Sequence, residues 1–470
     1  MSYMNHQRQM AVLAICGVLA TGTAGAYNSL SARVTSPHET VELQLQVAPG
    51  YAIRKVADQF SAPVGVSVSD RGDLYVAEAG RSEGTLPRVV KLGAGNNRTT
   101  VASDFPAPLT GLTWHDGRLY VAYAGGVDVL DPATGNHHPI LAKLPARGDY
   151  ANGAVVFGPD GKLYFGIGSA TNSGVVGQDN LKSGWVARYP EFRDIPCKDV
   201  KVKGNNFTVT NPLTKDPQDM ATTGAFSAFG STTARNQVIT GAVPCTGSIL
   251  RANPDGTDLQ LVAWGLRQPA GLHFGPDSEL YFTMQGFEDR GSRPIVGDRD
   301  YFYRAVSGQW YGWPDFAGNR SVTNEQFQKP SLPVTPLLAA RPAQPPQPIT
   351  SFAHGSGAAG LLFPPESFGL GGDALAALSG PGQPQESPAG HMVVRINPGT
   401  GTVAPFIKNG APGPASARDL PGLERPVALA ASPRGTVYLL DAGQSRPGPG
   451  GLESVPGTGV LWRIEWTARK

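Results

Sequence analysis

Two side chains with the chemistry of a general base stand beside small residues in this sequence. Asp149 lies in Gly148-Asp149-Tyr150-Ala151-Asn152-Gly153, and His354 lies in the run AHGSGAAG at 353–360. A carboxylate or a neutral imidazole can take a proton from a substrate hydroxyl. Tyr150, with an ordinary pKa near 10, is about three units too weak a base at neutral pH unless a nearby cation lowers it. The alternative interpretation is that these are hydrogen-bonded loop residues.

A second group of informative residues lies between Trp264 and Asn319. The segment opens with Gly265-Leu266-Arg267-Gln268-Pro269, passes a Gln285-Gly286 step, and closes with Tyr311-Gly312-Trp313-Pro314. It closely resembles the PQQ-dependent glucose/sorbosone dehydrogenases, in which G-x-R-N-P-x-G-L-x-F opens a propeller blade and Y-G-W-P closes the unit. Together with the repeated strand pattern described below, the resemblance covers most of residues 40–466.

This resemblance implies an aldose or aldosulose dehydrogenase that oxidises C1 with PQQ and calcium and passes electrons to an external acceptor. PQQ carries three carboxylates, so its site needs cations. Arg267 matches the cofactor-contacting arginine, Gln268 replaces the usual asparagine, and Arg425 matches the first arginine of an R-x-R pair. Gly286 and Phe287 fall where backbone carbonyls would hold calcium, a hard ion that prefers oxygen ligands.

Three positions depart from the pattern of the resembling family. Tyr150 stands where the family has its base histidine, and Val427 stands at the second arginine of R-x-R. No Lys or Arg occurs between Arg341 and Arg395, where the family has a lysine. We therefore keep Asp149, Tyr150 and His354 as candidate catalytic residues.

Two other functions remain as alternatives. One is a propeller that has lost the cofactor site and binds a glycan or a protein. The other is a metal-dependent lactonase, which would need a ring of carboxylates such as Glu78 and Asp441 at the ends of inner strands.

A repeated hairpin predicts the elements that position these residues. Two alternating apolar runs flank a polar turn at 64–80, 110–125, 153–169, 270–286 and 427–443, and a degenerate copy lies at 358–380. Further strands follow several of the copies. Hairpins followed by outer strands are typical of propeller blades. We predict an all-β, six-bladed β-propeller of four-stranded antiparallel blades over residues 40–467, with residues 41–57 closing the ring as an outer strand.

Two long stretches interrupt the repeat. Residues 170–243 form a loop insertion rich in Asn, Thr and Gly, and residues 319–350 form a Pro-rich connection. Loops of this length often contribute to binding sites. The chain has 60 Gly and 42 Pro, only 16% charged residues and a formal charge of +2, which argues against nucleic acid or an anionic membrane as the main partner.

The N-terminus predicts export. Residues 1–26 combine Arg8, a short apolar run at 11–20 and the cleavage-site pattern Ala24-Gly25-Ala26, as in a secretory signal peptide. We expect a periplasmic or secreted protein with no membrane-spanning segment after cleavage. Cys197 and Cys245 would then remain, and two cysteines in an oxidising compartment most simply form one disulfide, with two buried thiols as the alternative.

Overall fold

The computed structural model describes residues 32–33, 42–43, 45–81, 84–211, 213–214, 216–382, 389–448 and 451–467. The expected signal peptide, residues 1–26, lies outside these ranges. The α-helices within them are short: α1 (Gln178–Lys182) and α2 (Trp185–Arg188). No helix in the described ranges has the length and apolar character needed to cross a membrane.

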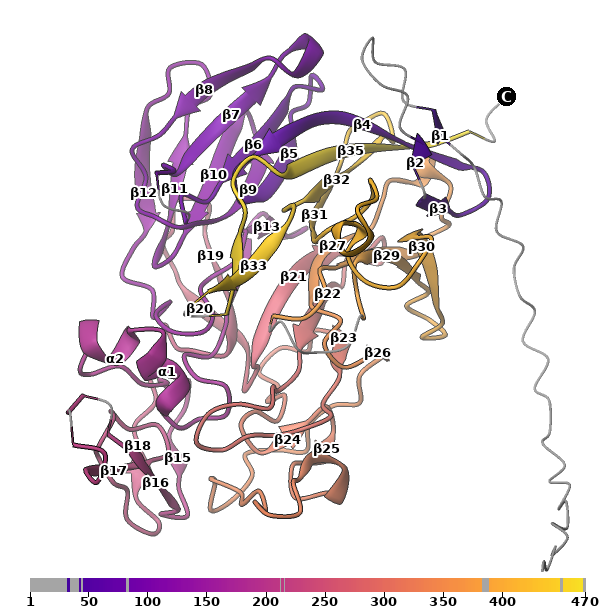
Figure 1. Cartoon of the computed structure of the whole chain (residues 1–470). Helices are drawn as coiled ribbons and strands as arrows, with labels where there is room; N and C mark the ends of the chain where they lie inside the picture. The colour runs from indigo at the N-terminus through magenta and orange to yellow at the C-terminus, as the bar shows by residue number, and fades with distance from the viewer. Residues whose placement is uncertain are drawn as a thin grey trace, which may run out of the picture.

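Six antiparallel sheets stand around a common centre and form the predicted six-bladed β-propeller (Figure 1). The first three blades, each given from its innermost strand outward, are β5 (Pro63–Val68), β6 (Leu74–Glu78), β7 (Arg88–Leu92) and β8 (Arg98–Ala102); β9 (Leu109–His115), β10 (Arg118–Tyr123), β11 (Gly126–Leu130) and β12 (His137–Leu141); and β13 (Val156–Phe157), β14 (Leu163–Ile167), β19 (Ser248–Ala252) and β20 (Gln260–Trp264).

The other three blades, given in the same order, are β21 (Gln268–Phe274), β22 (Leu280–Gln285), β23 (Asp300–Arg304) and β26 (Thr350–Phe352); β27 (Ala358–Leu362), β28 (Ala374–Leu378), β29 (Met392–Ile396), β30 (Val403–Asn409) and β3 (Leu45–Val47); and β31 (Pro426–Ala431), β32 (Val437–Asp441), β35 (Gly459–Trp466) and β4 (Tyr51–Phe60). All six repeated copies in the sequence therefore form the two innermost strands of a blade.

The N-terminal segment closes the ring, as predicted, but it contributes to two blades. β4 pairs antiparallel with β35 in the sixth blade, so that the first and last parts of the chain share one sheet. The preceding β3 pairs with β30 and gives the fifth blade a fifth strand. A further short pair joins β1 (Ala32–Arg33) and β2 (Glu42–Leu43).

The alternation of apolar residues explains how the blades pack. Tyr75, Tyr120, Tyr164 and Tyr281 of the repeated hairpins are all less than 9% exposed and lie among apolar side chains, whereas Tyr438 is half-buried. Tyr75 stacks on Trp114 of the second blade, with ring centroids 5.8 Å apart. A blade has too little core to be stable alone, so packing of this kind between neighbours stabilises the ring.

A glycine in the inner strand allows neighbouring blades to approach closely. A Cβ at Gly65 would lie 2.7 Å from the backbone nitrogen of Leu112, and one at Gly271 would lie 2.1 Å from the carbonyl oxygen of Ala359. Both distances are too short for any side chain. The glycine in the repeated V-G-V and A-G-L patterns is therefore required by contact between inner strands, and the inner strands together surround a central cavity.

The insertion and the Pro-rich connection lie together at one end of the propeller (Figure 1). The insertion lies between β14 and β19 and contains α1, α2 and the short strands β15 (Val200–Lys201), β16 (Asn206–Thr210), β17 (Met220–Gly224) and β18 (Val238–Ile239). The connection lies between β23 and β26 and contains β25 (Arg320–Ser321) and η2 (Glu325–Phe327), with β24 (Phe316–Ala317) just before it. The remaining short elements are η1 (Ala94–Asn96), η3 (Glu366–Phe368), η4 (Ala415–Arg418), β33 (Ser445–Gly448) and β34 (Gly451–Ser454).

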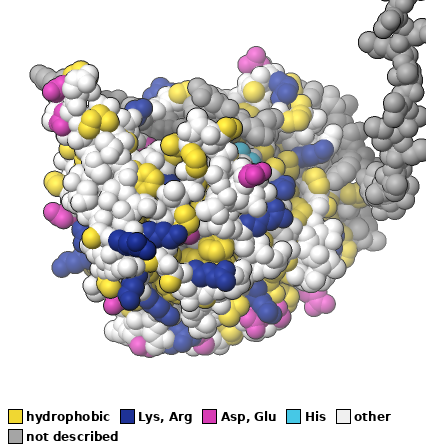
Figure 2. Space-filling model, turned by 90° about the horizontal axis from the view of Figure 1, so that it is seen from below, with side chains coloured by type: hydrophobic (Ala, Val, Ile, Leu, Met, Phe, Trp, Pro, Cys, Tyr) yellow, Lys and Arg dark blue, Asp and Glu magenta, His cyan; other side chains and the backbone are white. Residues whose placement is uncertain are grey.

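A disulfide and a buried arginine fasten the insertion to the propeller. Cys197 and Cys245 are bonded, which confirms the predicted pair and joins the insertion to the chain just before β19. The guanidinium of Arg293 is fully buried and donates to the carbonyl oxygens of Ser173 and Pro314 and to the Asp315 carboxylate. Figure 2 shows this end of the molecule, with Lys and Arg side chains spread across its middle and Asp and Glu mainly towards its edges.

Candidate functional site

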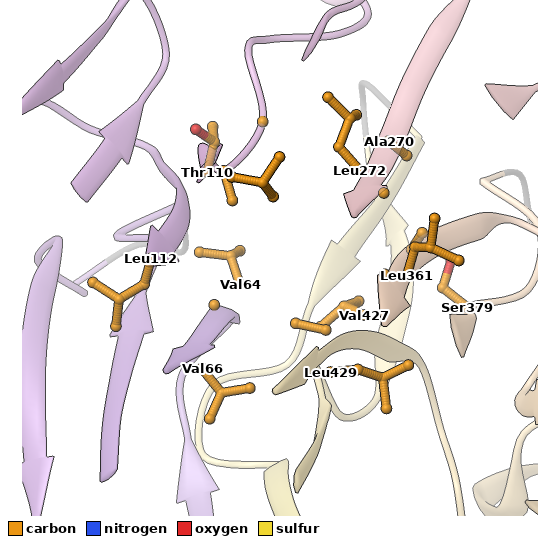
Figure 3. A pocket seen from close by; sticks show the side chains of 18 of the residues that line it. Val64, Val66, Thr110, Leu112, Ala270, Leu272, Leu361, Ser379, Val427 and Leu429 are labelled. Carbon is orange, nitrogen blue, oxygen red and sulfur yellow. The ribbon is translucent and has the colours of Figure 1, made fainter. Parts of the chain in front are cut away.

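Two adjoining cavities contain the eight residues that the sequence predicts for the site. The larger, about 1620 Å³, follows the centre of the ring, where inner-strand side chains such as Val64, Leu272 and Val427 line it (Figure 3). The smaller, about 60 Å³, lies beside it near the insertion. The eight predicted residues that line one or both cavities are Asp149, Tyr150, Arg267, Gln268, Gly286, Phe287, His354 and Arg425.

Loops at the ends of inner strands position these residues. Arg267 stands directly before β21 and Arg425 directly before β31, so both point inward from the start of an innermost strand. Gly286 and Phe287 follow β22, the neighbouring strand of the same blade as β21. Residues that precede inner strands of the fourth and sixth blades therefore meet at one end of the ring, so that Arg267 and Arg425, 158 residues apart in the sequence, line the same small cavity.

Arg267 is the buried cation of the site. Its side chain is 2% exposed, its Nε and Nη2 donate to Asn172 Oδ1, and Nη2 lies 3.0 Å from Glu288 Oε2. The guanidinium also lies over the Tyr150 ring, 4.8 Å from its centroid. Nη1 is buried and has no hydrogen-bond partner within the described residues. A buried guanidinium N–H without an acceptor is costly, so this atom is suited to an acceptor on a bound ligand.

Arg290 is the second cation and joins three carboxylates. Its Nη2 lies 2.7 Å from Asp149 Oδ2, its Nη1 lies 2.7 Å from Asp179 Oδ2, and its Nε lies 2.5 Å from Glu288 Oε2. Asp179 belongs to α1, so the insertion supplies part of the wall of the larger cavity. These ion pairs raise the pKa of the Arg290 guanidinium above its ordinary value despite its burial. It therefore stays charged, as arginine normally does.

Asp149 and Tyr150 lie next to each other but differ in their protonation. Burial, opposed by Arg290, raises the pKa of the Asp149 carboxyl to about 6. Asp149 also accepts from Asn180 Nδ2 at 3.1 Å, so both of its oxygens already have partners. Burial raises the pKa of the Tyr150 phenol well above its ordinary value, with Arg267 opposing the shift. Tyr150 is thus a neutral phenol near pH 7 and is not suited to act as a base.

His354 has the geometry of a general base. Its Nδ1 lies 2.6 Å from the backbone carbonyl of Asp298, and a carbonyl oxygen can only accept, so Nδ1 carries the proton. The neutral ring then keeps its lone pair on Nε2. The side chain is half-buried and lines both cavities. The Asp298 carboxylate in turn accepts from the Phe287 N–H at 2.8 Å, so one residue orients both His354 and the Gly286-Phe287 loop.

The Gly286-Phe287 loop lines the small cavity. The N–H of Gly286 donates to Asp300 and that of Phe287 to Asp298, which fixes the two peptide groups. Within the described residues no side chain and no loop N–H donates to either carbonyl oxygen. Free carbonyl oxygens are suitable calcium ligands. No group of three or more His, Cys, Asp or Glu able to hold a metal occurs in the described part of the chain.

Gln268 and Arg425 complete the predicted set of cofactor contacts. Gln268 Oε1 is buried without a hydrogen-bond partner among the described residues, on the side of the larger cavity occupied by Tyr150. Arg425 lines both cavities and donates from Nη1 to the Pro381 carbonyl at 2.9 Å. Among the described residues its other guanidinium N–H groups have no hydrogen-bond partner, so they are able to bind an anion. The residue types at the site therefore fit an anionic cofactor with several hydrogen-bonding groups.

Sequence reasoning missed two partners of Arg267, namely Glu288 and Asn172. Asn172 Oδ1 accepts from the Arg267 side chain and from the Glu288 N–H at 3.0 Å, and its Nδ2 donates to the Glu288 carbonyl at 2.8 Å. It comes from the insertion, where no spacing relates it to β21. The sequence feature that could have indicated Glu288 as a site residue is its position directly after the Gly286-Phe287 loop.

The carboxylates expected for a lactonase have structural roles. Glu78 is 2% exposed and accepts from the Ser61 N–H and from Arg88 Nε. Asp441 is 1% exposed and accepts from the N–H groups of Glu424 and Arg425. Neither lines either of the two cavities. Both hold the ends of neighbouring strands together.

No protein-family model matches this chain, and no curated protein matches its sequence. Solved structures do match its fold over most of its length. The PQQ-bound aldose sugar dehydrogenase from Streptomyces coelicolor has a TM-score of 0.52 and 15% identity, covering 89% of this chain and 99% of that one. The holo PQQ domain of pyranose dehydrogenase from Coprinopsis cinerea has a TM-score of 0.55 and 14% identity, covering 90% and 97%.

A third match comes from a carbohydrate-active enzyme of family AA12 from Trichoderma reesei. Its TM-score is 0.56 at 15% identity, covering 92% of this chain and 100% of that one. All three identities are low, so the matches establish the fold alone: this chain shares its propeller fold with these proteins. What it binds and catalyses must be argued from its own residues.

Proposed function

We propose that this protein is an exported quinoprotein dehydrogenase that oxidises an aldose or aldosulose at C1 with PQQ and calcium. The observation that carries the proposal is the convergence of Arg267, Arg425 and His354 on one small cavity, with a buried guanidinium N–H that has no acceptor. The likeness to solved PQQ sugar dehydrogenases supports it, because those proteins share the fold over about nine-tenths of the chain.

Each group at the site then has a chemical role. Arg267 and Arg425 bind the cofactor carboxylates, and Gln268 supplies a further hydrogen bond. The carbonyl oxygens of Gly286 and Phe287 bind calcium. When bound, PQQ supplies a quinone that accepts a hydride from C1 of the sugar, which is one proton together with two electrons.

His354 moves the proton that this oxidation releases. Its Nε2 lone pair takes the proton of the C1 hydroxyl as the carbon–hydrogen bond breaks, which leaves a lactone or an acid as product. The Asp298 carbonyl holds the ring in the required tautomer. Asp149, bound on both oxygens, orients Arg290 instead of acting as the base. An external acceptor would take up the two electrons that the oxidation removes from the sugar.

One alternative function rests on a specific observation. Arg267 already faces the carboxylate of Glu288, so the site has less free positive charge than a trianionic cofactor would favour. That observation favours a propeller that binds a glycan or a protein without catalysis. Val427 stands where the resembling family has a second arginine, and this loss of a cation also favours the non-catalytic alternative.

Dye reduction distinguishes the two functions. The purified protein is incubated with PQQ and calcium, and reduction of an artificial electron acceptor is followed over a panel of aldoses and sorbosone. The proposal expects turnover that requires both PQQ and a sugar. Binding of sugars or proteins without turnover at saturating PQQ would establish the non-catalytic alternative.

A further inference from the structure

Glu288 lies at the junction of the two cavities and lines both of them. Its side chain is 16% exposed. One oxygen, Oε2, is shared by Arg267 and Arg290, at 3.0 and 2.5 Å. The other, Oε1, points across the cavity, where a Cβ added at Gly382 would lie 3.3 Å away. The carboxylate therefore occupies the space through which a ligand would reach the Arg267 guanidinium.

The charges around Glu288 leave no excess of cations. Arg267 and Arg290 face three carboxylates, those of Asp149, Asp179 and Glu288. A ligand carboxylate that reaches Arg267 thus meets a carboxylate already there, and like charges a few ångströms apart repel each other.

From this arrangement we infer that Glu288 is a built-in competitor for the anion-binding site on Arg267. An anionic cofactor binds by replacing the Glu288 carboxylate on the Arg267 guanidinium, and Glu288 remains paired with Arg290. The inference rests on the proposed function, since it takes PQQ as the anion. Glu288 thus sets the affinity of this chain for the cofactor and recognises neither the sugar nor the electron acceptor.

The surroundings of Glu288 allow this exchange. Arg290 Nε holds Glu288 independently of Arg267, and the two Nη atoms of Arg290 are fixed by Asp149 and by Asp179 of α1. Glu288 therefore keeps one charged partner when it leaves Arg267. The Arg267 guanidinium keeps its hydrogen bonds to Asn172 Oδ1, so it stays in position for the incoming carboxylate.

The test is an equilibrium titration of PQQ, with calcium present, into the wild-type protein and the Glu288→Gln variant. The amide keeps the size of the side chain and can still accept from Arg290, but it removes the competing charge. We expect the dissociation constant for PQQ to fall by about tenfold or more, the scale of one like charge removed from a few ångströms away. The control is Glu279→Gln, an exposed carboxylate on the same blade, which should leave the constant unchanged.

The possible results separate this inference from the proposed function. If the wild-type protein binds PQQ and Glu288→Gln binds it equally or more weakly, the inference is wrong and the proposed function stands. If neither protein binds PQQ, both are wrong. Should Glu288→Gln fail to unfold cooperatively on heating, Glu288→Asp is titrated instead, because its shorter side chain cannot reach both guanidinium groups. A smaller gain in affinity is then expected, and an unchanged constant would overturn the inference.

Discussion

His354 donates its Nδ1–H to the backbone carbonyl of Asp298 across 2.6 Å, and this bond leaves Nε2 free at the cavity wall. The pair explains how the chain can have a base although Tyr150 stands where the resembling family has a histidine. The Asp298 carboxylate also holds the Phe287 N–H, so the base and the carbonyl loop share one support. The fourth blade and the loop that follows it would therefore position the proposed base and the proposed cofactor site together.

His354→Gln should lower kcat by about 10²–10⁴-fold, the usual contribution of a positioned general base. The amide cannot accept a proton near neutral pH, so the loss should appear in kcat much more than in PQQ affinity. Steady-state dye reduction and a PQQ titration measure the two effects separately. A kcat within a few-fold of the wild-type value would show that His354 is not the base.

Tyr150→Phe should retain most of the activity. Burial raises the pKa of the phenol far above neutrality, so Tyr150 has no role as a proton acceptor to lose. The phenylalanine ring keeps the surface that lies beneath Arg267. We expect kcat to change by no more than about tenfold, the effect of one neutral hydrogen bond, with the shape of its pH profile unchanged. A collapse of kcat comparable with that of His354→Gln would make Tyr150 the catalytic residue instead.

The Cys197–Cys245 disulfide should stabilise the protein by restraining the insertion. The two cysteines are 48 residues apart, and closing a loop of that length in the unfolded chain is worth about 4 kcal/mol in the chain-entropy model. The double variant Cys197→Ser/Cys245→Ser should therefore unfold at lower denaturant concentration than the wild-type protein. Adding a reductant to the wild-type protein should reproduce the shift, and the same reductant should leave the double variant unaffected. Equal midpoints for variant and wild type would show that the bond contributes nothing to stability.

His137 should make folding stability depend on pH. Its Nε2 lies 2.7 Å from Asp104 and its Nδ1 lies 2.7 Å from Asp128. Burial favours the neutral ring, but the two carboxylates outweigh burial and raise the pKa of His137 above its ordinary value. The protonated ring therefore adds stability below the unfolded pKa of about 6.5, and this contribution is lost as the pH rises through the folded pKa.

The free energy of unfolding of His137→Gln tests this linkage. The loss of free energy of unfolding relative to the wild type should be larger at pH 5.5 than at pH 9 by about 0.5–1 kcal/mol, which is the scale of a partly exposed ion pair. His138→Gln, at the exposed neighbouring position, is the control and should show the same difference from wild type at both pH values. A deficit in His137→Gln that does not change with pH would refute the role of the charged ring.

The sequence predicted the fold well because each blade repeats one local pattern. Alternating apolar residues, polar turns and an inner-strand glycine are all visible within about 17 residues, as at 64–80. Residues 45–47 were expected in the outer strand of the last blade, but they form β3 of the fifth blade, because the alternation of apolar residues does not show which open sheet edge a strand pairs with.

The candidate site was predictable only in part. Motif positions named the residues that line the cavities, yet they did not reveal how those residues are paired. Asp149 and Arg290 are 141 residues apart, and Asn172 lies 116 residues before Glu288. Such contacts depend on how the third blade and the insertion pack against the fourth blade, and no spacing rule describes that. The ion pair of Arg267 with Glu288 could therefore be found only in three dimensions.

A crystal structure of the protein grown with saturating PQQ and calcium would test the central claim most directly. We predict a PQQ carboxylate at about 2.7–3.0 Å from Arg267 Nη1 and Nη2, with His354 Nε2 facing the side of the quinone where the sugar binds. A site that remains free of PQQ at saturating concentration, or PQQ bound away from Arg267 and His354, would contradict it.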